Sequence, residues 1–146
     1  MNLSANVKVD QVLGYYAAGT TKRTSDIVDM SGYDGCLFVC ELGTIIENGT
    51  IDCFVDQNTA NSTSGMARLA TTTAHTVTAA NAALAKSCIL IDVYQPQERY
   101  LQCNITPATQ NAVILGITAI RYSGKVKPAT GSTALKSTLL FGAEEA

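Results

Sequence analysis

The sequence predicts a single all-β domain, a jelly roll or a related antiparallel β-sandwich with terminal arms. The chain has 146 residues, which suits one domain with one hydrophobic core. Threonine, valine and isoleucine are plentiful, and short apolar runs recur between turn-forming residues, which is typical of sandwiches and barrels. Apolar residues make up 47% of the chain and charged residues 15%, so the composition is that of a globular protein. We expect an N-terminal arm at 1–10, the sandwich at 11–122, and a C-terminal arm or last strand at 123–146.

The first predicted strands lie on either side of the dipeptide Asn48-Gly49. Residues 36–40 are apolar at every position, as in a central strand that is covered on both faces. Asn48-Gly49 accepts the positive φ angles of a type I′ turn, so we expect it to join 44–46 and 50–55 as a hairpin. The period of two along the outgoing strand turns three side chains toward the core, those of Ile51, Cys53 and Val55.

Three further strands are predicted in the second half of the chain. Residues 87–94 alternate between two faces until a proline interrupts the pattern. Residues 99–105 follow, with three side chains expected to face inward, those of Leu101, Cys103 and Ile105. After a loop expected at Pro107, the apolar run 112–122 is rich in β-branched residues and predicts a long strand, slightly bent at Gly116.

Other segments are expected to lie outside these strands. Residues 57–65 are polar turn formers and predict an exposed loop, whereas the alanine-rich residues 79–86 permit one or two helical turns. Beyond residue 122 the chain turns to Ser, Gly, Lys, Pro, Ala and Thr. Two alternatives remain for its end: a last strand that packs Leu139 and Phe141 on its own domain, or an arm that orders on a neighbour.

Charge and cysteine content exclude several classes of partner. The formal net charge is −2 and the ten Lys and Arg residues are scattered, so we expect no nucleic-acid binding. No apolar run is long enough to cross a bilayer and the N-terminus is polar, so we expect synthesis in a cytoplasm and no membrane partner. The five cysteines lie inside apolar runs, which favours buried free thiols over a metal site or a disulfide framework. They are Cys36, Cys40, Cys53, Cys88 and Cys103.

No catalytic pattern stands out along the chain. His75 is the single histidine, and no serine lies in the G-x-S-x-G turn of hydrolases. Two carboxylate pairs are available for glycosidase chemistry, Asp26 with Asp29 and Asp52 with Asp56, but such spacings are more typical of solvated strand faces. The sequence also lacks a phosphate-binding loop and a ligand spacing for metals. We therefore predict no enzyme, no cofactor, no metal and no small-molecule substrate.

Three blocks of sequence carry a resemblance to a known family. They are 28–39 (VDMSGYDGCLFV), 95–101 (QPQERYL), and 110–114 (QNAVI) followed by 119–122 (AIRY). In this order they resemble the capsid cement or decoration proteins found among the head genes of tailed bacteriophages, over about residues 7–128. The resemblance implies a jelly-roll or related β-sandwich without catalytic residues, located on the outer capsid surface of the virion. It also implies two partners, the major capsid protein and other copies of the chain in a homodimer or homotrimer.

The sequence thus favours a protein that binds the outside of a capsid lattice and stabilises it. A low-copy head-completion or tail component is the alternative within the same class. A carbohydrate-binding β-sandwich is the alternative from another class, although the chain has no tryptophan to form an aromatic platform. The candidate capsid or subunit contacts lie toward the ends of the chain and at four tyrosines, for which half-buried packing on the domain is the alternative: Val7, Val9, Tyr15, Tyr16, Tyr33, Tyr94, Lys125, Lys127, Leu139, Leu140 and Phe141.

Overall fold

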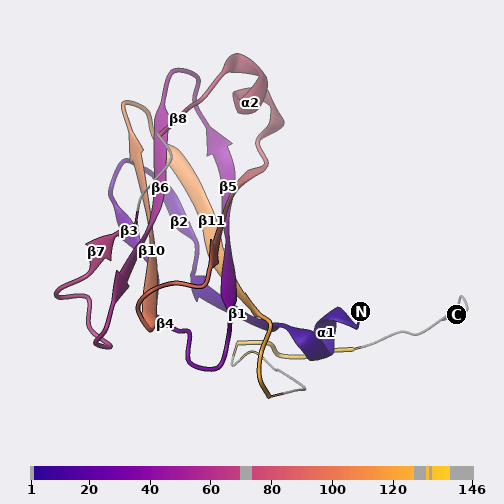
Figure 1. Cartoon of the computed structure of the whole chain (residues 1–146). Coiled ribbons are helices and arrows are strands. Elements are labelled where there is room, and N and C mark those ends of the chain that lie inside the picture. The colour runs from indigo at the N-terminus through magenta and orange to yellow at the C-terminus, as the bar shows by residue number, and fades with distance from the viewer. Residues whose placement is uncertain (1, 70–73, 127–130, 132, 139–146) are drawn as a thin grey trace, which may run out of the picture.

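The computed structural model describes residues 2–69, 74–126, 131 and 133–138, which form two antiparallel sheets packed face to face (Figure 1). Sheet A consists of β1 (Lys8–Leu13), β2 (Tyr16–Gly19), β5 (Gly35–Ile45), β9 (Ser87–Tyr94) and β11 (Ala112–Tyr122). Sheet B consists of β3 (Arg23–Thr24), β4 (Val28–Asp29), β6 (Thr50–Asn58), β7 (Ala67–Arg68), β8 (His75–Thr76) and β10 (Tyr100–Ala108). Two short helices complete the described elements, α1 (Leu3–Asn6) and α2 (Ala79–Leu84).

The short strands combine into longer, interrupted edge strands. β1 and β2 pair with successive stretches of β11. In the same way, β3 and β4 pair with β10, and β7 and β8 pair with β6. Counted this way the chain makes eight passes, numbered in order β1/β2, β3/β4, β5, β6, β7/β8, β9, β10 and β11. The order of these passes across the sheet is 1-8-3-6 in sheet A and 2-7-4-5 in sheet B. This is the double Greek key of a jelly roll, so the predicted fold class is confirmed.

The core lies between the two sheets and is built by the predicted alternation. In β10 the inward side chains of Leu101, Cys103 and Ile105 have no exposed surface, and the inward residues of β6 are buried as expected. β5 is central in sheet A, between β11 and β9, and Phe38 on its inner face is fully buried. The outer face of β5 is only half-buried, so the expectation that both faces of 36–40 are covered is correct for one face.

The predicted hairpin at Asn48-Gly49 is wrong, because the chain changes sheets there. β5 belongs to sheet A and β6 to sheet B. The turn is closed by the Gly49 N–H, which donates to the Ile46 carbonyl at 3.1 Å, so its central residues are Glu47 and Asn48. Of these, Asn48 has a positive φ (65°), whereas a type I′ turn requires positive φ at both. The local turn signal was real, but it does not determine which strand the chain pairs with next.

Pro107 also differs from the prediction, because it lies inside β10 rather than in a loop. It is opposite Ile51 of β6 and is fully buried. Proline is tolerated because the pairing of β10 with β3 stops at Ile105, so within the described strands β10 has a free edge at Pro107. β11, by contrast, spans 112–122 as predicted, and its register shifts beside Gly116.

The N-terminal arm is shorter than predicted. Residues 8–10 belong to β1, where Lys8 lies opposite Arg121, and Val7 is only 7% exposed. These residues pair with β11, and Asp10 also forms a buried ion pair with Arg121. Neither of the helices within the described residues has the length and apolar character that a membrane span requires.

In the C-terminal region, the described part of 123–138 contributes no strand to either sheet. Thr133 nevertheless contacts the free edge of β1. Its hydroxyl accepts a hydrogen bond from the Gln11 N–H at 2.7 Å, and its own N–H donates to Asp10 Oδ1 at 3.2 Å. Lys127, Leu139, Leu140 and Phe141 lie outside the described residues.

Candidate functional site

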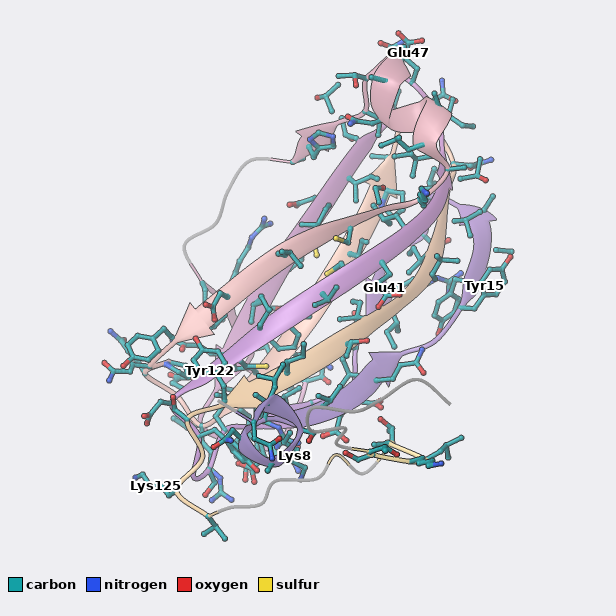
Figure 2. All side chains as sticks on the ribbon, turned by 90° about the vertical axis from the view of Figure 1, so that its right-hand side faces the viewer. Lys8, Tyr15, Glu41, Glu47, Tyr122 and Lys125 are labelled. Carbon is teal, nitrogen blue, oxygen red and sulfur yellow. The ribbon has the colours of Figure 1, made fainter. Side chains whose placement is uncertain are left out.

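The outer face of sheet A is covered with apolar side chains, and we call it the apolar face. It comprises Val9, Leu37, Val39, Leu90, Tyr94, Val113, Leu115, Ile120 and Tyr122. The strand register arranges these side chains in rows: Val9 lies opposite Ile120, and Ile120 lies opposite Leu37 on the next strand. Figure 2 looks onto this side of the molecule, with β9, β5, β11 and β1 crossing the view.

Solvent reaches much of the apolar face. Leu90 and Tyr94 on the edge strand β9 are 59% and 62% exposed, and Leu115 on β11 is 42% exposed. Antiparallel sheets usually turn polar side chains to water on the face away from the core. Contiguous apolar surface that stays exposed is typical of sites that contact another molecule. The face also carries negative charge, from the exposed residues Glu41 and Asp92.

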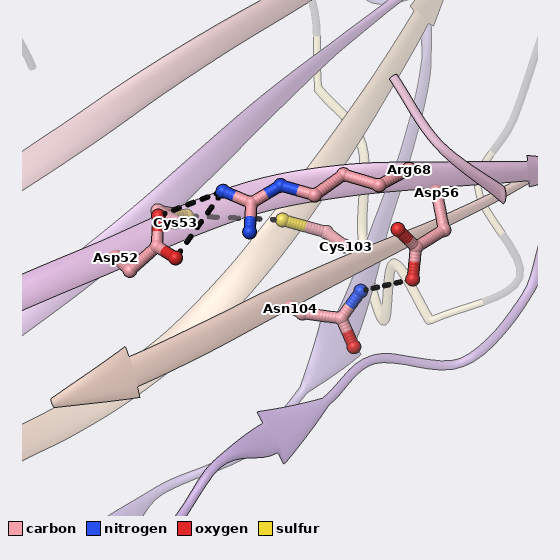
Figure 3. Close-up of polar contacts among 6 residues, drawn as sticks. All are labelled: Asp52, Cys53, Asp56, Arg68, Cys103 and Asn104. Atoms are coloured by element: carbon pink, nitrogen blue, oxygen red, sulfur yellow. Dashed lines mark hydrogen bonds and ion pairs between the residues drawn. The ribbon is translucent and has the colours of Figure 1, made fainter. Parts of the chain in front are cut away.

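The outer face of sheet B carries polar side chains, and the contacts of Asp52, Asp56 and Asn104 are drawn in Figure 3. Asp52 accepts two hydrogen bonds from Arg68, at 3.1 and 3.2 Å, and the Arg68 guanidinium lies 3.9 Å from the centre of the Phe54 ring. Asp56 accepts a hydrogen bond from the Asn104 side chain at 3.0 Å. The two acidic residues, which the sequence offered as a carboxylate pair, therefore each have a separate structural partner. Of the two sheets, sheet A therefore has the more apolar outer face.

Asp29 and His75, which the sequence also offered as titratable groups, have structural partners as well. Arg99 holds Asp29 through two hydrogen bonds of 2.9 Å, one from Nε and one from Nη2. The Arg99 side chain lowers the pKa of the Asp29 carboxyl, and a hydrogen bond from the Ser31 N–H lowers it further. His75 Nε2 lies 3.0 Å from the side-chain oxygen of Asn81, at the start of α2. These contacts connect neighbouring elements of the fold.

Two tyrosines form an ordered feature at one end of the apolar face. The rings of Tyr94 and Tyr122 are parallel within 2°, with centres 6.5 Å apart. Gly35 lies between them in the register, and a Cβ there would be 2.2 Å from the Tyr122 ring, so the ring occupies space that only glycine leaves free. The Tyr122 hydroxyl donates to Asp92 at 2.6 Å. Burial and this hydrogen bond raise the pKa of Tyr122 to about 12.

The predicted contact residues fall into different environments. Val9 and Tyr94 lie on the apolar face, and Tyr15 is 64% exposed at the kink between β1 and β2. Val7, in contrast, is buried at the end of the sandwich, so it has little surface to offer a partner. Lys125 is exposed, and its N–H bonds to the Gly32 carbonyl at 2.9 Å.

Tyr16 and Tyr33 are half-buried and pack on the domain itself. The Arg23 guanidinium lies 4.1 Å from the centre of the Tyr16 ring, and Arg121 lies 5.2 Å from that of Tyr33. Sequence reasoning missed most of the apolar face, including the exposed Leu90. The available signal was the run of apolar residues at 36–40, which predicts a strand covered on both faces, and at 112–122, which predicts a long strand.

A second feature lies in the core, where three cysteines meet, and we call it the thiol cluster. Cys40 of β5, Cys53 of β6 and Cys103 of β10 are buried, with Sγ–Sγ distances of 2.7 Å (Cys40–Cys53), 3.7 Å (Cys40–Cys103) and 3.9 Å (Cys53–Cys103). Three thiol sulfurs at this spacing are potential ligands for a soft metal ion. Cys36 is also buried, whereas Cys88 is exposed, so the prediction of buried thiols is wrong for Cys88.

The sandwich opens beside the thiol cluster, between β6 and β9. A groove of about 630 Å³ lies there, and its walls include Cys53, Phe54, Leu69 and Ile91. The inward side chains of β9 are only half-buried, because β9 is an edge strand whose one partner among the described strands is β5. The groove therefore leads from solvent to Cys53.

Comparison with known proteins does not identify a family. No protein-family model matches the chain, and no curated protein matches it. Among solved structures, the chain is similar to dimeric latent PorU from Porphyromonas gingivalis, with 10% sequence identity and a TM-score of 0.43. That similarity covers 82% of this chain and 13% of the PorU chain.

Proposed function

We propose that this chain is a virion structural protein that binds the outside of a tailed-phage capsid lattice and stabilises it. The observation that carries the proposal is the apolar face, a regular surface on which Leu90 and Tyr94 are largely exposed. Burying a fully exposed leucine gains about 1.5–3 kcal/mol, so Leu90, which is 59% exposed, would gain roughly 1–2 kcal/mol on a partner. The jelly-roll topology adds support, because it is a common architecture of viral capsid domains.

The sequence resemblance to capsid cement proteins directs the proposal to one partner, the major capsid protein. The acidic residues Glu41 and Asp92 favour a partner surface that is apolar at its centre and carries Lys or Arg at its edge. A lattice repeats this surface many times, so a dimer or trimer of the chain would bind several sites at once. Multivalent binding then makes a modest contact per copy strong.

The first test is the copy number of the protein in purified virions, measured by quantitative mass spectrometry against the major capsid protein. A ratio near one, or a simple fraction of one, supports lattice decoration. A few copies per particle would instead assign the chain to head completion or to the tail. Absence from the particle would refute a structural role in the virion.

The second test asks whether the apolar face makes the contact. Leu90→Ser removes an apolar side chain that is 59% exposed on β9, and Leu84→Ser is a matched control at 54% exposure on α2. We expect purified Leu90→Ser to bind undecorated capsids more weakly than the wild type, and Leu84→Ser to bind normally. Both variants should keep the wild-type melting temperature, because neither residue is buried. Equal binding by the two variants would exclude this part of the face.

The parallel tyrosines support a second candidate function, carbohydrate binding. Aromatic rings present flat apolar surfaces on which sugar rings can pack, and Tyr94 is 62% exposed. A glycan array would test this candidate, with Tyr94→Ala as the variant and Tyr15→Ala, at 64% exposure, as the matched control. Binding that Tyr94→Ala removes and Tyr15→Ala keeps would establish it, and an array without hits would exclude it.

A further inference from the structure

The thiol cluster joins the two sheets across the core. Cys40 belongs to sheet A, whereas Cys53 and Cys103 belong to adjacent strands of sheet B. The Sγ atoms of Cys40 and Cys53 are 2.7 Å apart, clearly closer than either is to Cys103. A disulfide between Cys40 and Cys53 would therefore need the smallest movement of the sulfur atoms, and it would link the two sheets covalently.

The cluster also favours ionisation of one particular thiol. The Sγ atoms of Cys103 and Cys40 lie 3.9 Å and 2.7 Å from Cys53 Sγ, and their hydrogen-bonding contacts lower the pKa of the Cys53 thiol. For Cys103, the contacts with Cys40 and Cys53 together with burial raise the pKa of the thiol. Cys36 lies outside the cluster, and burial raises its pKa to about 12. The thiolate is the reactive form of cysteine, so reactivity is concentrated at Cys53.

Cys53 is also the member of the cluster that reaches a route from solvent. It contributes to the wall of the groove between β6 and β9 and is 5% exposed, whereas Cys40 and Cys103 have no exposed surface. A molecule close to the size of water, such as hydrogen peroxide, can approach along this groove. A reactive thiol at the wall and a second thiol behind it form the arrangement of a peroxide-sensitive cysteine pair.

Charge favours a disulfide over a metal ion at this position. Three thiolates around a monovalent or divalent ion leave a net negative charge in an apolar core, which is costly without further partners. A structural zinc site has four protein ligands, and the group found within the described residues has three cysteines. A disulfide is uncharged and fits among Phe38, Ile117 and the other apolar residues of the core.

We propose that Cys53 and Cys40 are a peroxide-oxidised pair that forms a disulfide between the two sheets. In the first step the Cys53 thiolate attacks one oxygen of hydrogen peroxide. The O–O bond breaks, the Cys53 sulfur becomes a sulfenic acid, and the leaving hydroxide takes up a proton as water. In the second step Cys40 Sγ attacks Cys53 Sγ, the S–O bond breaks, and the leaving hydroxide takes the Cys40 proton as a second water. Two thiols and one peroxide thus give one disulfide and two waters.

This inference does not depend on the proposed capsid role. It gives the domain two covalent states, one with free thiols and one with its sheets linked. The disulfide closes a short loop between β5 and β6, and chain-entropy arguments for loops of this length predict a rise in melting temperature of roughly 10 °C.

The experiment uses the full-length protein with Cys88→Ser, because the exposed Cys88 would otherwise link two molecules. The protein is treated with hydrogen peroxide, denatured and alkylated, and its intact mass and peptides are measured. We expect a loss of two hydrogens, two of the four remaining cysteines protected from alkylation, and a cross-linked peptide pair containing Cys40 and Cys53. Dithiothreitol should restore all four thiols and the lower melting temperature.

Two matched variants show which thiol reacts. Cys53→Ala should abolish the mass loss, and Cys36→Ala, a buried cysteine outside the cluster, should keep it. Three results would overturn the proposal: thiols that all stay free in peroxide, a cross-link that contains Cys103, or a metal ion bound by the purified protein in native mass spectrometry. Because the first two readouts come from the protein with all three cluster cysteines, they remain decisive even if a variant fails to fold.

Discussion

Replacing Arg121 with methionine is expected to destabilise the sandwich by about 4 kcal/mol, because it breaks a buried ion pair. Arg121 Nη2 lies 2.6 Å from Asp10 Oδ2, and the two side chains are only 12% and 8% exposed. Arg121 Nη1 also donates to the Asp29 carbonyl at 2.7 Å. One side chain of β11 thus connects β1 in its own sheet with β4 in the opposite sheet.

The magnitude follows from what the substitution leaves behind. Asp10 keeps the hydrogen bond from Thr133 but loses its guanidinium in a buried position, which typically costs about 3–5 kcal/mol. Loss of the donor to the Asp29 carbonyl adds about 1 kcal/mol, and the slight exposure of the pair offsets part of this. This is a large part of the about 5–15 kcal/mol that stabilises a domain of this size. At about 3–4 °C per kcal/mol, the melting temperature should fall by roughly 15 °C.

Urea unfolding followed by circular dichroism measures this loss. Arg99→Met is the matched control, because Arg99 also binds an aspartate at 2.9 Å but is 54% exposed, and we expect it to remain close to the wild type. Asp10→Asn in the Arg121→Met background removes the stranded charge and should recover part of the stability. The reasoning would be refuted if Arg121→Met cost no more than Arg99→Met, or if Asp10→Asn gave no recovery.

Three further predictions concern single positions. Arg99 lowers the pKa of Asp29 below its usual 3.8, so the ionised carboxylate stabilises the fold above pH 3.8 and this contribution is lost as the pH falls through the folded value. In urea titrations, the unfolding free energy of Asp29→Asn should therefore depend less on pH in the acid range than that of the wild type. Gly35→Ala should displace the Tyr122 ring, and an ultraviolet titration should show the pKa of Tyr122 falling from about 12 toward the usual value near 10. Gly116→Ala places a Cβ 2.7 Å from a β1 carbonyl oxygen and should lower the urea midpoint, by about 2 kcal/mol of unfolding free energy.

The parts of the fold that the sequence predicted are those determined by local alternation. Ile51 and Val55 in β6, and Leu101 and Ile105 in β10, face the core because side chains on a strand alternate with a period of two. The helical turns at α2 were predicted from the alanine-rich segment, and the structure adds a capping box at Thr78. Such features can be predicted because they depend only on residues that are close together in the sequence.

The parts that failed depend on contacts between distant segments. At Asn48 the turn was recognised, but the change of sheet depends on pairing of β6 with β10, about 50 residues later. The thiol cluster could not be predicted for the same reason, because its cysteines are 13, 50 and 63 positions apart. The apolar face was missed for a different reason. Leu37 and Val39 have the same sequence pattern whether a second layer of the fold or a binding partner covers them.

The position of β1 changes how a contribution of the N-terminus to binding must be tested. Deleting residues 1–10 would remove Asp10 and with it the buried partner of Arg121, so lost binding after that deletion would report on folding as well as on contact. Deleting residues 1–6 removes α1 but leaves Val7, which is buried, and the whole of β1. Capsid binding that survives the shorter deletion but fails in Leu90→Ser would place the contact on the apolar face, whereas the opposite result would place it on the N-terminal segment.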